Sequence, residues 1–371
     1  MAAAQQKGGR KRTMKKIMGF VLAGCLAAGL VACGKSPEEN GGSVTNGTVQ
    51  TSAEVPAANQ EAELVIQLGH IDPAANDPYQ MLAEEFAGKV SELSGGKIEI
   101  DILSDAQLGS EASMIEGMKL GTIDCAIISN FSYSSHIPEF CTFDMPYLFM
   151  NEEQARAVMD DKDITGDLID QLYDEYDVKI LAYGEGGFRS VIGTVKPINT
   201  PDDLAGIKIR VPGNETYLAT FSALKANPVS MASSECYTGL QQGTIDGLEQ
   251  PIGPMYSYKS YEVCGYISLT EHLYNPISLT VSRSLWESLG QEEQGWLQEA
   301  AEYARDTQRS QMEEFNKELL QAMSDEKGVA VNEVEDKNAF RESVQPVYDD
   351  YIARFGSERL NKIEALTGTL K

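Results

Sequence analysis

Apolar and polar residues alternate along Ile207–Val211, which is the period of a β-strand. The alternation ends at Pro212–Gly213, a dipeptide that is typical of a turn. The last charged residue of this pattern, Arg210, therefore lies near the carboxyl end of the predicted strand. Because open α/β sheets bind their ligands outside the carboxyl ends of the strands, Arg210 is the first candidate for a ligand contact.

The chemistry of Arg210 leaves two interpretations open. Strands of such a sheet are usually covered on both faces, and a buried guanidinium is unfavourable unless an anion meets it. The anion could be a ligand carboxylate, which the planar guanidinium can bind through two parallel hydrogen bonds. It could equally be an internal partner, Asp246 or Glu249, and the spacing alone does not choose between the two.

The region around Arg210 has a counterpart earlier in the chain. Residues 117–124 read GMKLGTID, and residues 239–246 read GLQQGTID. Each segment follows a strand pattern and an amphipathic helical pattern, and each leads into a further apolar stretch. The repeated order predicts two related α/β lobes. A cleft between two lobes is a preferred place for a small-molecule site.

Periodicity predicts the remaining elements of an α/β fold, including one helix, Gln291–Ser324, that is unusually long and could run along both lobes. The glycine-rich segment Tyr183–Gly187 is predicted to be a loop that crosses between the lobes. Further strands are predicted at Leu64–Leu68, Lys97–Leu103, Ile123–Ile128 and Val178–Ala182, and further helices at Tyr79–Leu93, Glu111–Leu120 and Arg156–Tyr176.

Polar residues follow the predicted strands of the first lobe, on the side where such a sheet binds a ligand. His70 follows the first strand, and Ser129 and Asn130 follow the strand at Ile123–Ile128. These three residues are candidate ligand contacts. A hydrogen-bonded structural role is the alternative for His70.

The first 32 residues have the features of an export signal. A basic start is followed by the apolar stretch Ile17–Ala32, which is shorter than a typical membrane span. The stretch ends in LVAC at residues 30–33, which resembles a bacterial lipobox with Cys33 as the lipidated residue. An ordinary signal peptide or a membrane anchor is the alternative, and Met14 is an alternative start. Residues 33–61 are rich in small and polar residues and predict a flexible tether.

Charge and motif content exclude some classes of function. The chain carries a net charge of -26, which argues against binding to nucleic acid or electrostatically to anionic lipid. The sequence contains no hydrolase motif, no phosphate-binding loop and no metal-ligand spacing, so we expect no enzyme, no cofactor and no metal site. Besides Cys25 and Cys33, we expect free, mostly buried thiols at Cys125, Cys141, Cys236 and Cys264.

From Leu64 to about Leu366 the chain resembles the solute-binding proteins of tripartite ATP-independent periplasmic (TRAP) transporters, the DctP family. The motifs are QLGSE at 107–111, GFR at 187–189, KIRVP at 208–212, DGLEQP at 246–251, KSYEV at 259–263 and SLTEH at 268–272. The resemblance implies an α/β fold, a two-lobed clamshell like that of periplasmic binding proteins, with the long helix spanning both lobes. The expected ranges are 62–186 for the first lobe, 187–275 for the second, 276–315 for the return to the first lobe and the bridging helix, and 316–371 for a C-terminal segment on the second lobe.

The same resemblance implies a function. The chain would be a monomeric, lipid-anchored receptor on the extracytoplasmic face that captures an organic acid and delivers it to the TRAP membrane subunits. Arg210 would grip the ligand carboxylate, Arg189 would add a second contact, and Gln250 stands where the family usually has asparagine. A surface charge is the alternative role for Arg189. Further candidate contacts are Asn214, Ser233, Ser129, Asn130, His70 and Glu111.

The candidate residues also bear on the ligand. The first lobe offers neutral polar residues and no clear second cation, which favours a sugar acid such as a uronate or aldonate over a C4-dicarboxylate. Ser233, Ser129 and Ser132 stand where relatives that bind sialic acid carry aromatic or charged residues, so sialic acid is not expected. A lipid-anchored hydrolase and a sensor domain for a membrane kinase are the alternatives from other classes.

Overall fold

The computed structural model describes residues 62–369 of the 371-residue chain. The predicted signal peptide, the lipidation site Cys33 and the tether lie outside the described residues. Within them, a mixed nine-stranded sheet has the order β2-β1-β3-β8-β4-β7-β5-β6, and β9 pairs with β8. The strands are β1 (Leu64–Gly69), β2 (Ile98–Leu103), β3 (Cys125–Ser129), β4 (Val178–Gly193), β5 (Lys208–Val211), β6 (Asn227–Ser230), β7 (Gly247–Pro251), β8 (Tyr266–Ser282) and β9 (Ala330–Glu333).

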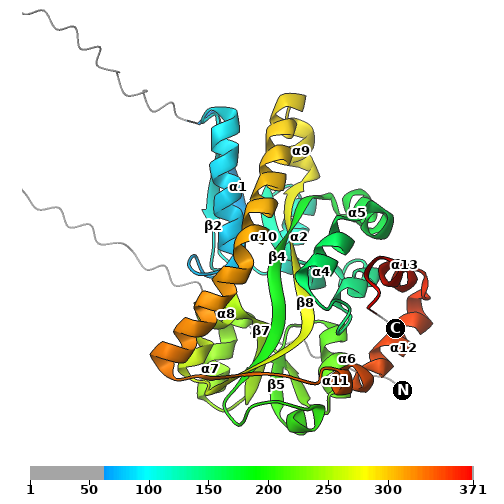
Figure 1. The fold of residues 1–371 in the computed structure, drawn as a ribbon. Coiled ribbons are helices and arrows are strands. Elements are labelled where there is room, and N and C mark those ends of the chain that lie inside the picture. The colour runs from blue at the N-terminus through cyan, green and yellow to red at the C-terminus, as the bar shows by residue number, and fades with distance from the viewer. Residues whose placement is uncertain (1–61, 370–371) are drawn as a thin grey trace, which may run out of the picture. The chain divides into compact units, whose positions relative to one another are not determined.

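Helices connect these strands and pack on the sheet (Figure 1). The helices expected at Tyr79–Leu93 and Glu111–Leu120 are found within one residue of their predicted ends. The α-helices are α1 (Pro78–Ser94), α2 (Glu111–Lys119), α3 (Asn130–Tyr133), α4 (Glu152–Asp160), α5 (Lys162–Tyr176), α6 (Glu215–Ala223), α7 (Cys236–Gln241), α8 (Ile252–Ser257), α9 (Arg283–Ser288), α10 (Gln291–Lys327), α11 (Asn338–Ser343), α12 (Gln345–Phe355) and α13 (Glu358–Thr367).

Two long antiparallel strands, β4 and β8, join the two halves of the sheet. β1, β2 and β3 lie on one side of this pair, and β5, β6 and β7 lie on the other. β8 pairs with β3 near its C-terminal end, and β4 pairs with β7 near its own C-terminal end. The predicted two-lobed α/β clamshell is therefore confirmed, with β1–β3 in the first lobe and β5–β7 in the second. The residue ranges of the lobes stay a prediction, since one continuous sheet passes through both.

The predicted crossing loop at Tyr183–Gly187 is wrong, because β4 continues through this segment as one strand of 16 residues. β4 pairs with β8 along this segment, and a register shift between Glu185 and Gly187 marks a β-bulge. Gly187 has a φ of 92°, which an L side chain rarely adopts. A bulge and a loop both favour glycine, so composition alone could not tell one from the other.

The long helix is confirmed, and α10 extends over 37 residues from the predicted start at Gln291. It contacts α1 in the first lobe, β4 in the middle of the sheet and α8 in the second lobe. The helix therefore lies along both lobes (Figure 1). Gly328 ends it as a left-handed cap with a φ of 70°.

The single helix predicted at Arg156–Tyr176 is wrong, because α4 ends at Asp160 and a new helix, α5, begins at Lys162. Asp161 lies between them in an extended conformation, and its side chain accepts a hydrogen bond from the amide of Asp163 at 2.7 Å. An aspartate that caps a helix in this way competes with the backbone for donors. The apolar periodicity does not register such a break.

The two GTID segments form the same turn. The amide of Thr122 donates to the carbonyl of Gly117 at 2.8 Å, and the amide of Thr244 donates to the carbonyl of Gly239 at 2.9 Å. The glycines within the two GTID motifs have φ values of 67° and 68°. Each turn leads into a strand, β3 in the first lobe and β7 in the second. The repeat in the sequence is thus a repeat of local structure.

The C-terminal helices contact both lobes. α12 packs on α6 of the second lobe, whereas α13 contacts α4 and α5. Arg359 of α13 holds Asp167 of α5 through two hydrogen bonds of 2.7 and 2.9 Å. The segment that was expected on the second lobe therefore also contacts helices from the range assigned to the first.

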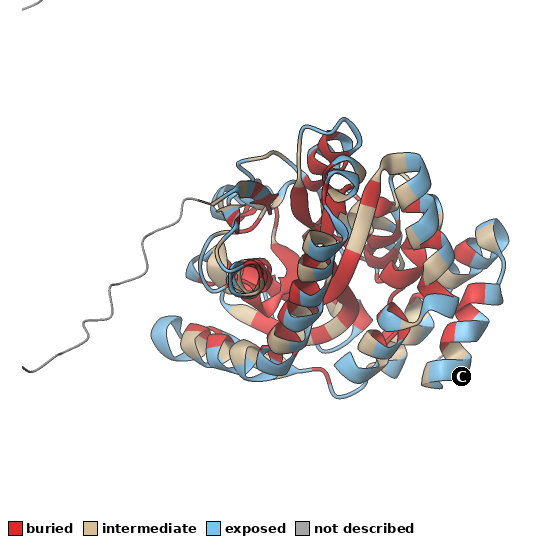
Figure 2. Cartoon of the chain, turned by 90° about the horizontal axis from the view of Figure 1, so that it is seen from above, coloured by how far each residue is buried: buried red, intermediate tan, exposed pale blue. Residues whose placement is uncertain are grey.

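Buried residues concentrate on the sheet and on the helix faces that turn toward it (Figure 2). The expected free and buried thiols are confirmed for Cys125, Cys141, Cys236 and Cys264. No helix in the part of the chain that the structure describes is long and apolar enough to span a membrane.

Candidate ligand-binding site

A small cavity lies between the lobes, at the carboxyl ends of β3, β5 and β7. Its volume is about 30 Å³, far below the roughly 300–1,000 Å³ of a typical ligand pocket. The two lobes are therefore closed on each other. The lining residues are Ile71, Asp72, Tyr79, Ser129, Phe131, Arg189, Arg210, Pro212, Ser233, Gln250, Pro251, Pro254 and Asn275.

Five of the nine predicted contact residues line this cavity, and they come from segments far apart in the sequence. Four of them lie in or near strands of the second lobe, and the fifth ends β3 of the first lobe. They are Arg210, Arg189, Gln250, Ser233 and Ser129. The remaining four residues lie behind the lining or away from it.

Arg210 lies near the end of β5 and is only 3% exposed. Its Nε donates to the carbonyl of Met231 at 2.8 Å, and its Nη2 donates to Ser233 Oγ at 3.2 Å. Both acceptors are neutral, and no carboxylate within residues 62–369 lies in ion-pair contact with Arg210. Burial raises the pKa of Asp72, the acid in the same lining, and Arg210 is close enough to lower that pKa in part. A buried charge without a hydrogen-bonded counter-charge is unfavourable, so this guanidinium is arranged to receive an anion.

The internal ion pair considered for Arg210 does not form with either proposed partner. Asp246 accepts a hydrogen bond from the backbone amide of Lys208 at 2.9 Å. Glu249 is held by a different arginine, Arg189. Arg210 is thereby left with its charge facing the cavity.

Arg189 takes the internal partner instead. Its Nε and Nη2 donate to the two carboxylate oxygens of Glu249 at 2.6 and 2.7 Å. Glu249 Oε2 also lies 3.2 Å from His272 Nε2, and all three side chains are buried. Burial disfavours both charges, yet the pair raises the pKa of Arg189 and holds the pKa of Glu249 below its usual value. The alternative that Arg189 is a surface charge is therefore wrong, since it is a buried ion-pair partner that also lines the cavity.

Ser129 and Tyr79 line the wall that the first lobe contributes, and their hydroxyl groups are hydrogen-bonded to each other. Glu111 lies behind them and accepts hydrogen bonds from the amide of Ser129 at 2.8 Å and from Ser132. Burial raises the pKa of Glu111 to about 7, against these hydrogen bonds, which lower it. Glu111 thus holds the wall in place and does not itself line the cavity.

Asn130 and Asn214 lie outside the cavity lining, and Asn214 connects the lobes. Asn130 Nδ2 donates to Asp144 Oδ1 at 3.0 Å, both in the first lobe. Asn214, which caps α6 in the second lobe, reaches the opposite lobe and donates to Ser134 Oγ at 2.8 Å and to Asp144 Oδ2 at 3.4 Å. Burial raises the pKa of Asp144 to about 7, although both amides lower it. These residues hold the lobes together in the closed state.

His70 lies away from the cavity lining. Its Nε2 is 2.9 Å from Gln80 Oε1 on α1, and burial lowers its pKa. The structure places His70 in the hydrogen-bonded structural role.

Three polar lining residues were missed by the sequence reasoning: Asp72, Tyr79 and Asn275. Asp72 accepts a hydrogen bond from the Tyr258 hydroxyl at 2.9 Å, and burial raises its pKa. It follows β1 by three residues, so the rule that selected His70 could also have found Asp72. Asn275 lies inside the long strand β8, although it forms an Asn-Pro pair with Pro276, which is more typical of a turn.

Two buried side-chain oxygens at the cavity have no hydrogen-bond partner in the described part of the chain. They are Gln250 Oε1, on the second-last residue of β7, and Asn275 Oδ1 on β8. Both residues are less than 4% exposed. An unpaired buried acceptor is uncommon in folded proteins, because it has lost its bond to water without a replacement.

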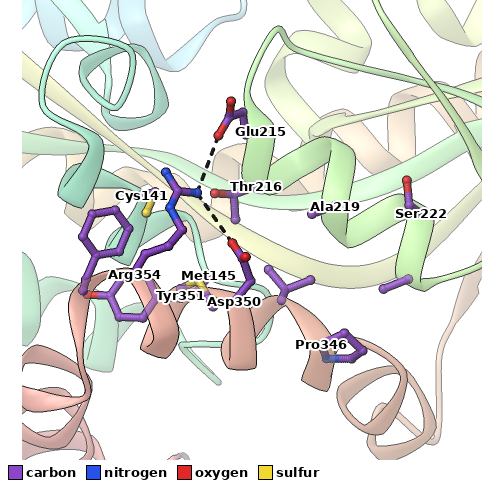
Figure 3. A pocket seen from close by; sticks show the side chains of 13 residues that line it. Cys141, Met145, Glu215, Thr216, Ala219, Ser222, Pro346, Asp350, Tyr351 and Arg354 are labelled. Carbon is purple, nitrogen blue, oxygen red and sulfur yellow. Dashed lines mark ion pairs between the residues drawn. The ribbon is translucent and has the colours of Figure 1, made fainter.

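A larger cavity of about 480 Å³ opens between α6 and α12 (Figure 3). Arg354 crosses it and lies 3.6 Å from both Glu215 and Asp350. None of the predicted contact residues line it. Its one arginine faces two acids, so its charges do not favour an acidic ligand. Residues 62–369 also contain no cluster of histidine, cysteine and acidic residues that could hold a metal ion.

Comparison with known proteins identifies the class to which this fold and site belong. The chain matches the family of bacterial extracellular solute-binding proteins, family 7 (DctP), over residues 68–354. The chain therefore belongs to this family of extracytoplasmic receptors, which bind solutes and are not a class of enzymes.

Two named relatives show the range of the family. The chain is 32% identical over 273 residues to the 2,3-diketo-L-gulonate-binding periplasmic protein YiaO of Escherichia coli, covering 74% of this chain and 82% of the relative. It is 28% identical over 306 residues to the C4-dicarboxylate-binding protein DctB of Bacillus subtilis, covering 81% and 86%.

Two solved structures are similar in fold. A TRAP periplasmic solute-binding protein of Chromohalobacter salexigens with bound D-glucuronate is 31% identical, with a TM-score of 0.76, covering 82% of this chain and 99% of that one. The sugar acid binding protein DctPAm of Advenella mimigardefordensis, in complex with galactonate, is 30% identical with a TM-score of 0.78, covering 83% and 99%.

Proposed function

We propose that this protein binds a sugar acid between its lobes through Arg210 and delivers it to the membrane subunits of a TRAP transporter. The observation that carries the proposal is the charge balance at the cavity. Arg189 and Arg210 both line it, but only Arg189 has a carboxylate partner among the described residues. One buried guanidinium is thus available for one ligand carboxylate, with which it can form two parallel hydrogen bonds.

The same balance favours a monocarboxylate over a C4-dicarboxylate. A second carboxylate would need a second uncompensated cation, and the remaining charged residue of the lining is the acid Asp72. The other polar lining groups are hydroxyls and amides, which suit the hydroxyl groups of a uronate or aldonate. The related structures with D-glucuronate and galactonate support this choice. A C4-dicarboxylate remains the second candidate, because the DctB relative is named for that ligand.

Binding requires the lobes to open and close, because the cavity of about 30 Å³ is too small to admit a sugar acid from solution. We propose that β4 and β8 bend where they pass between the lobes, with 62–186 and 187–275 as the main moving ranges. The ligand would then stabilise the closed state. Small-angle scattering with and without D-glucuronate should show a smaller radius of gyration in the complex, and an unchanged value would contradict this motion.

Attachment to the membrane is proposed from the sequence pattern at residues 30–33, which lie outside the described residues. Cys33 would carry the lipid, and the receptor would act as a monomer outside the membrane. Replacement of Cys33 by alanine should release the protein from the membrane fraction. Continued retention in that fraction would contradict the lipid anchor.

The ligand class can be tested with purified protein. D-glucuronate, D-galactonate, succinate and malate would each be titrated into the protein by calorimetry, and thermal stability would be measured in parallel, since a ligand that binds the folded state raises its stability. We expect the tightest binding for one of the two sugar acids. Tighter binding of succinate or malate would establish the dicarboxylate alternative, and consumption of a ligand would indicate an enzyme instead.

A further inference from the structure

Asn275 occupies an unusual place in the sheet. It lies on β8 directly opposite the bulge in β4, where the pairing shifts from Glu185 with Pro276 to Gly187 with Asn275. The extra residue of the bulge is Gly186. Bulges often re-aim a side chain beside a functional site, because they bend and twist the strand locally.

Gly186 leaves room for the carboxamide of Asn275. A Cβ atom at residue 186 would lie 2.3 Å from Asn275 Nδ2 and 2.8 Å from the Asn275 carbonyl, closer than real contacts allow. Any other amino acid at this position would therefore displace the amide. The nitrogen lies against this glycine, and the side chain lines the cavity beside Arg210.

The carboxamide oxygen of Asn275 has no partner in residues 62–369, although the residue is only 3% exposed. The same holds for Gln250 Oε1 in the same lining. Leaving a buried acceptor unpaired is unfavourable, because its bond to water is lost without a replacement. Two such acceptors lie in the same lining as a guanidinium that has no carboxylate partner. A ligand with one carboxylate and with O–H groups that can donate would complement these three groups.

We propose that Asn275 is a specificity-determining residue that accepts a hydrogen bond from a ligand hydroxyl, with Gln250 Oε1 as a second acceptor. This inference rests on the proposed function and adds the atoms that accept hydrogen bonds from the ligand. A hydroxyl group can donate to either oxygen, whereas an ionised second carboxylate can only accept. A dicarboxylate would leave both oxygens unpaired and would meet Asp72, so the subsite selects against it.

The test compares a hydroxylated acid with a hydroxyl-free acid of similar shape. D-glucuronate, cyclohexanecarboxylate and succinate would be titrated by calorimetry into the wild type and into Asn275→Leu, which keeps the approximate volume and removes the acceptor. A site built around hydrogen-bonding groups discriminates strongly against ligands that lack the partner. We expect the wild type to bind D-glucuronate at least 100-fold more tightly than cyclohexanecarboxylate, and Asn275→Leu to reduce this ratio at least tenfold.

Two further variants make the result specific. Asn275→Asp keeps an acceptor at the same place, so it should lower the affinity for both acids through its charge while keeping most of the preference for the hydroxylated one. Asn332→Leu removes a different amide, on β9, which donates to the Ile198 carbonyl at 3.0 Å and lies outside the cavity lining. It should leave the ratio unchanged.

The outcomes separate the two levels of the proposal. If the wild type binds neither D-glucuronate nor D-galactonate, the proposed function fails. If the wild type binds either sugar acid and Asn275→Leu keeps the wild-type preference for that acid over cyclohexanecarboxylate, the inference about Asn275 is overturned while the proposed function stands.

Discussion

The two arginines that line the cavity differ in their partners, because Arg189 is paired with a carboxylate and Arg210 is bound only by neutral acceptors. Around Arg189, three buried side chains form a closed group, with Glu249 bound through both carboxylate oxygens and His272 on the far side of the acid. Around Arg210, on β5, the acceptors are a backbone carbonyl and a serine hydroxyl. One region is complete without a ligand, and the other has a charge that a ligand can balance.

This difference shows that a buried arginine beside a cavity is not by itself a binding residue. The test is whether its charge is already compensated, because breaking a buried pair and supplying a missing partner have opposite energetic consequences. Arg189 should therefore matter first for folding, and Arg210 should matter first for binding. If the two roles are distinct, substitutions at Arg189 and at Arg210 should affect stability and affinity differently.

The largest effect is expected from Arg189→Met. The substitution would leave the Glu249 carboxylate buried without its cation, and such a loss destabilises a protein by about 3–5 kcal/mol. Urea unfolding without ligand would measure the change. Arg210→Met is the matched control and should change the stability much less, because Arg210 has no ion-pair contact to lose. A similar loss in both variants would show that the two arginines play the same structural role.

The next effect concerns affinity for D-glucuronate. Arg210→Ala should weaken binding at least tenfold, since losing a hydrogen-bonded charge partner costs about 2–5 kcal/mol. Arg210→Lys should also lose much of the affinity, because an ammonium group lacks the planar fork. Calorimetric titration would give both values. Near-wild-type affinity in the two variants would remove Arg210 from the site.

A smaller effect is expected from the pH dependence of the Arg189 region. Burial lowers the pKa of His272, although Glu249 raises it in part. The unfolded chain therefore binds a proton at this histidine more readily than the folded one, so stability falls as the pH drops below about 6.5. His272→Gln should lose less stability than the wild type between pH 7 and pH 5. Urea unfolding of both proteins at pH 7 and pH 5 would measure these losses. An equal loss of stability in His272→Gln and the wild type would contradict this contribution of His272.

The smallest effect is expected from Ser233→Ala. It removes one neutral hydrogen bond of 3.2 Å to Arg210 Nη2, and such bonds contribute about 0.5–1.5 kcal/mol. The affinity for D-glucuronate should fall by less than tenfold and should stay well above that of Arg210→Ala. A loss as large as that of Arg210→Ala would mean that Ser233 itself holds the ligand.

Local patterns in the sequence determined the parts of this protein that depend on near neighbours. The alternation at Ile207–Val211 placed Arg210 near the end of a strand, the two GTID segments marked equivalent turns, and the periodicity after Gln291 marked the long helix. Each of these features rests on residues a few positions apart, because strand alternation, helical periodicity and glycine turns are local properties of the chain.

The tertiary structure alone decided how the charges and acceptors of the site are paired. Glu249 is 60 residues from Arg189 in the sequence and 39 from Arg210, and only the alignment of β4 with β7 shows which arginine it binds. The glycines at 186–187 became a bulge and not a loop because β8 pairs with them, and the same pairing brings Asn275 to the cavity. Burial then sets the consequence, since a charge or acceptor removed from water must find its partner among groups that only the fold brings near.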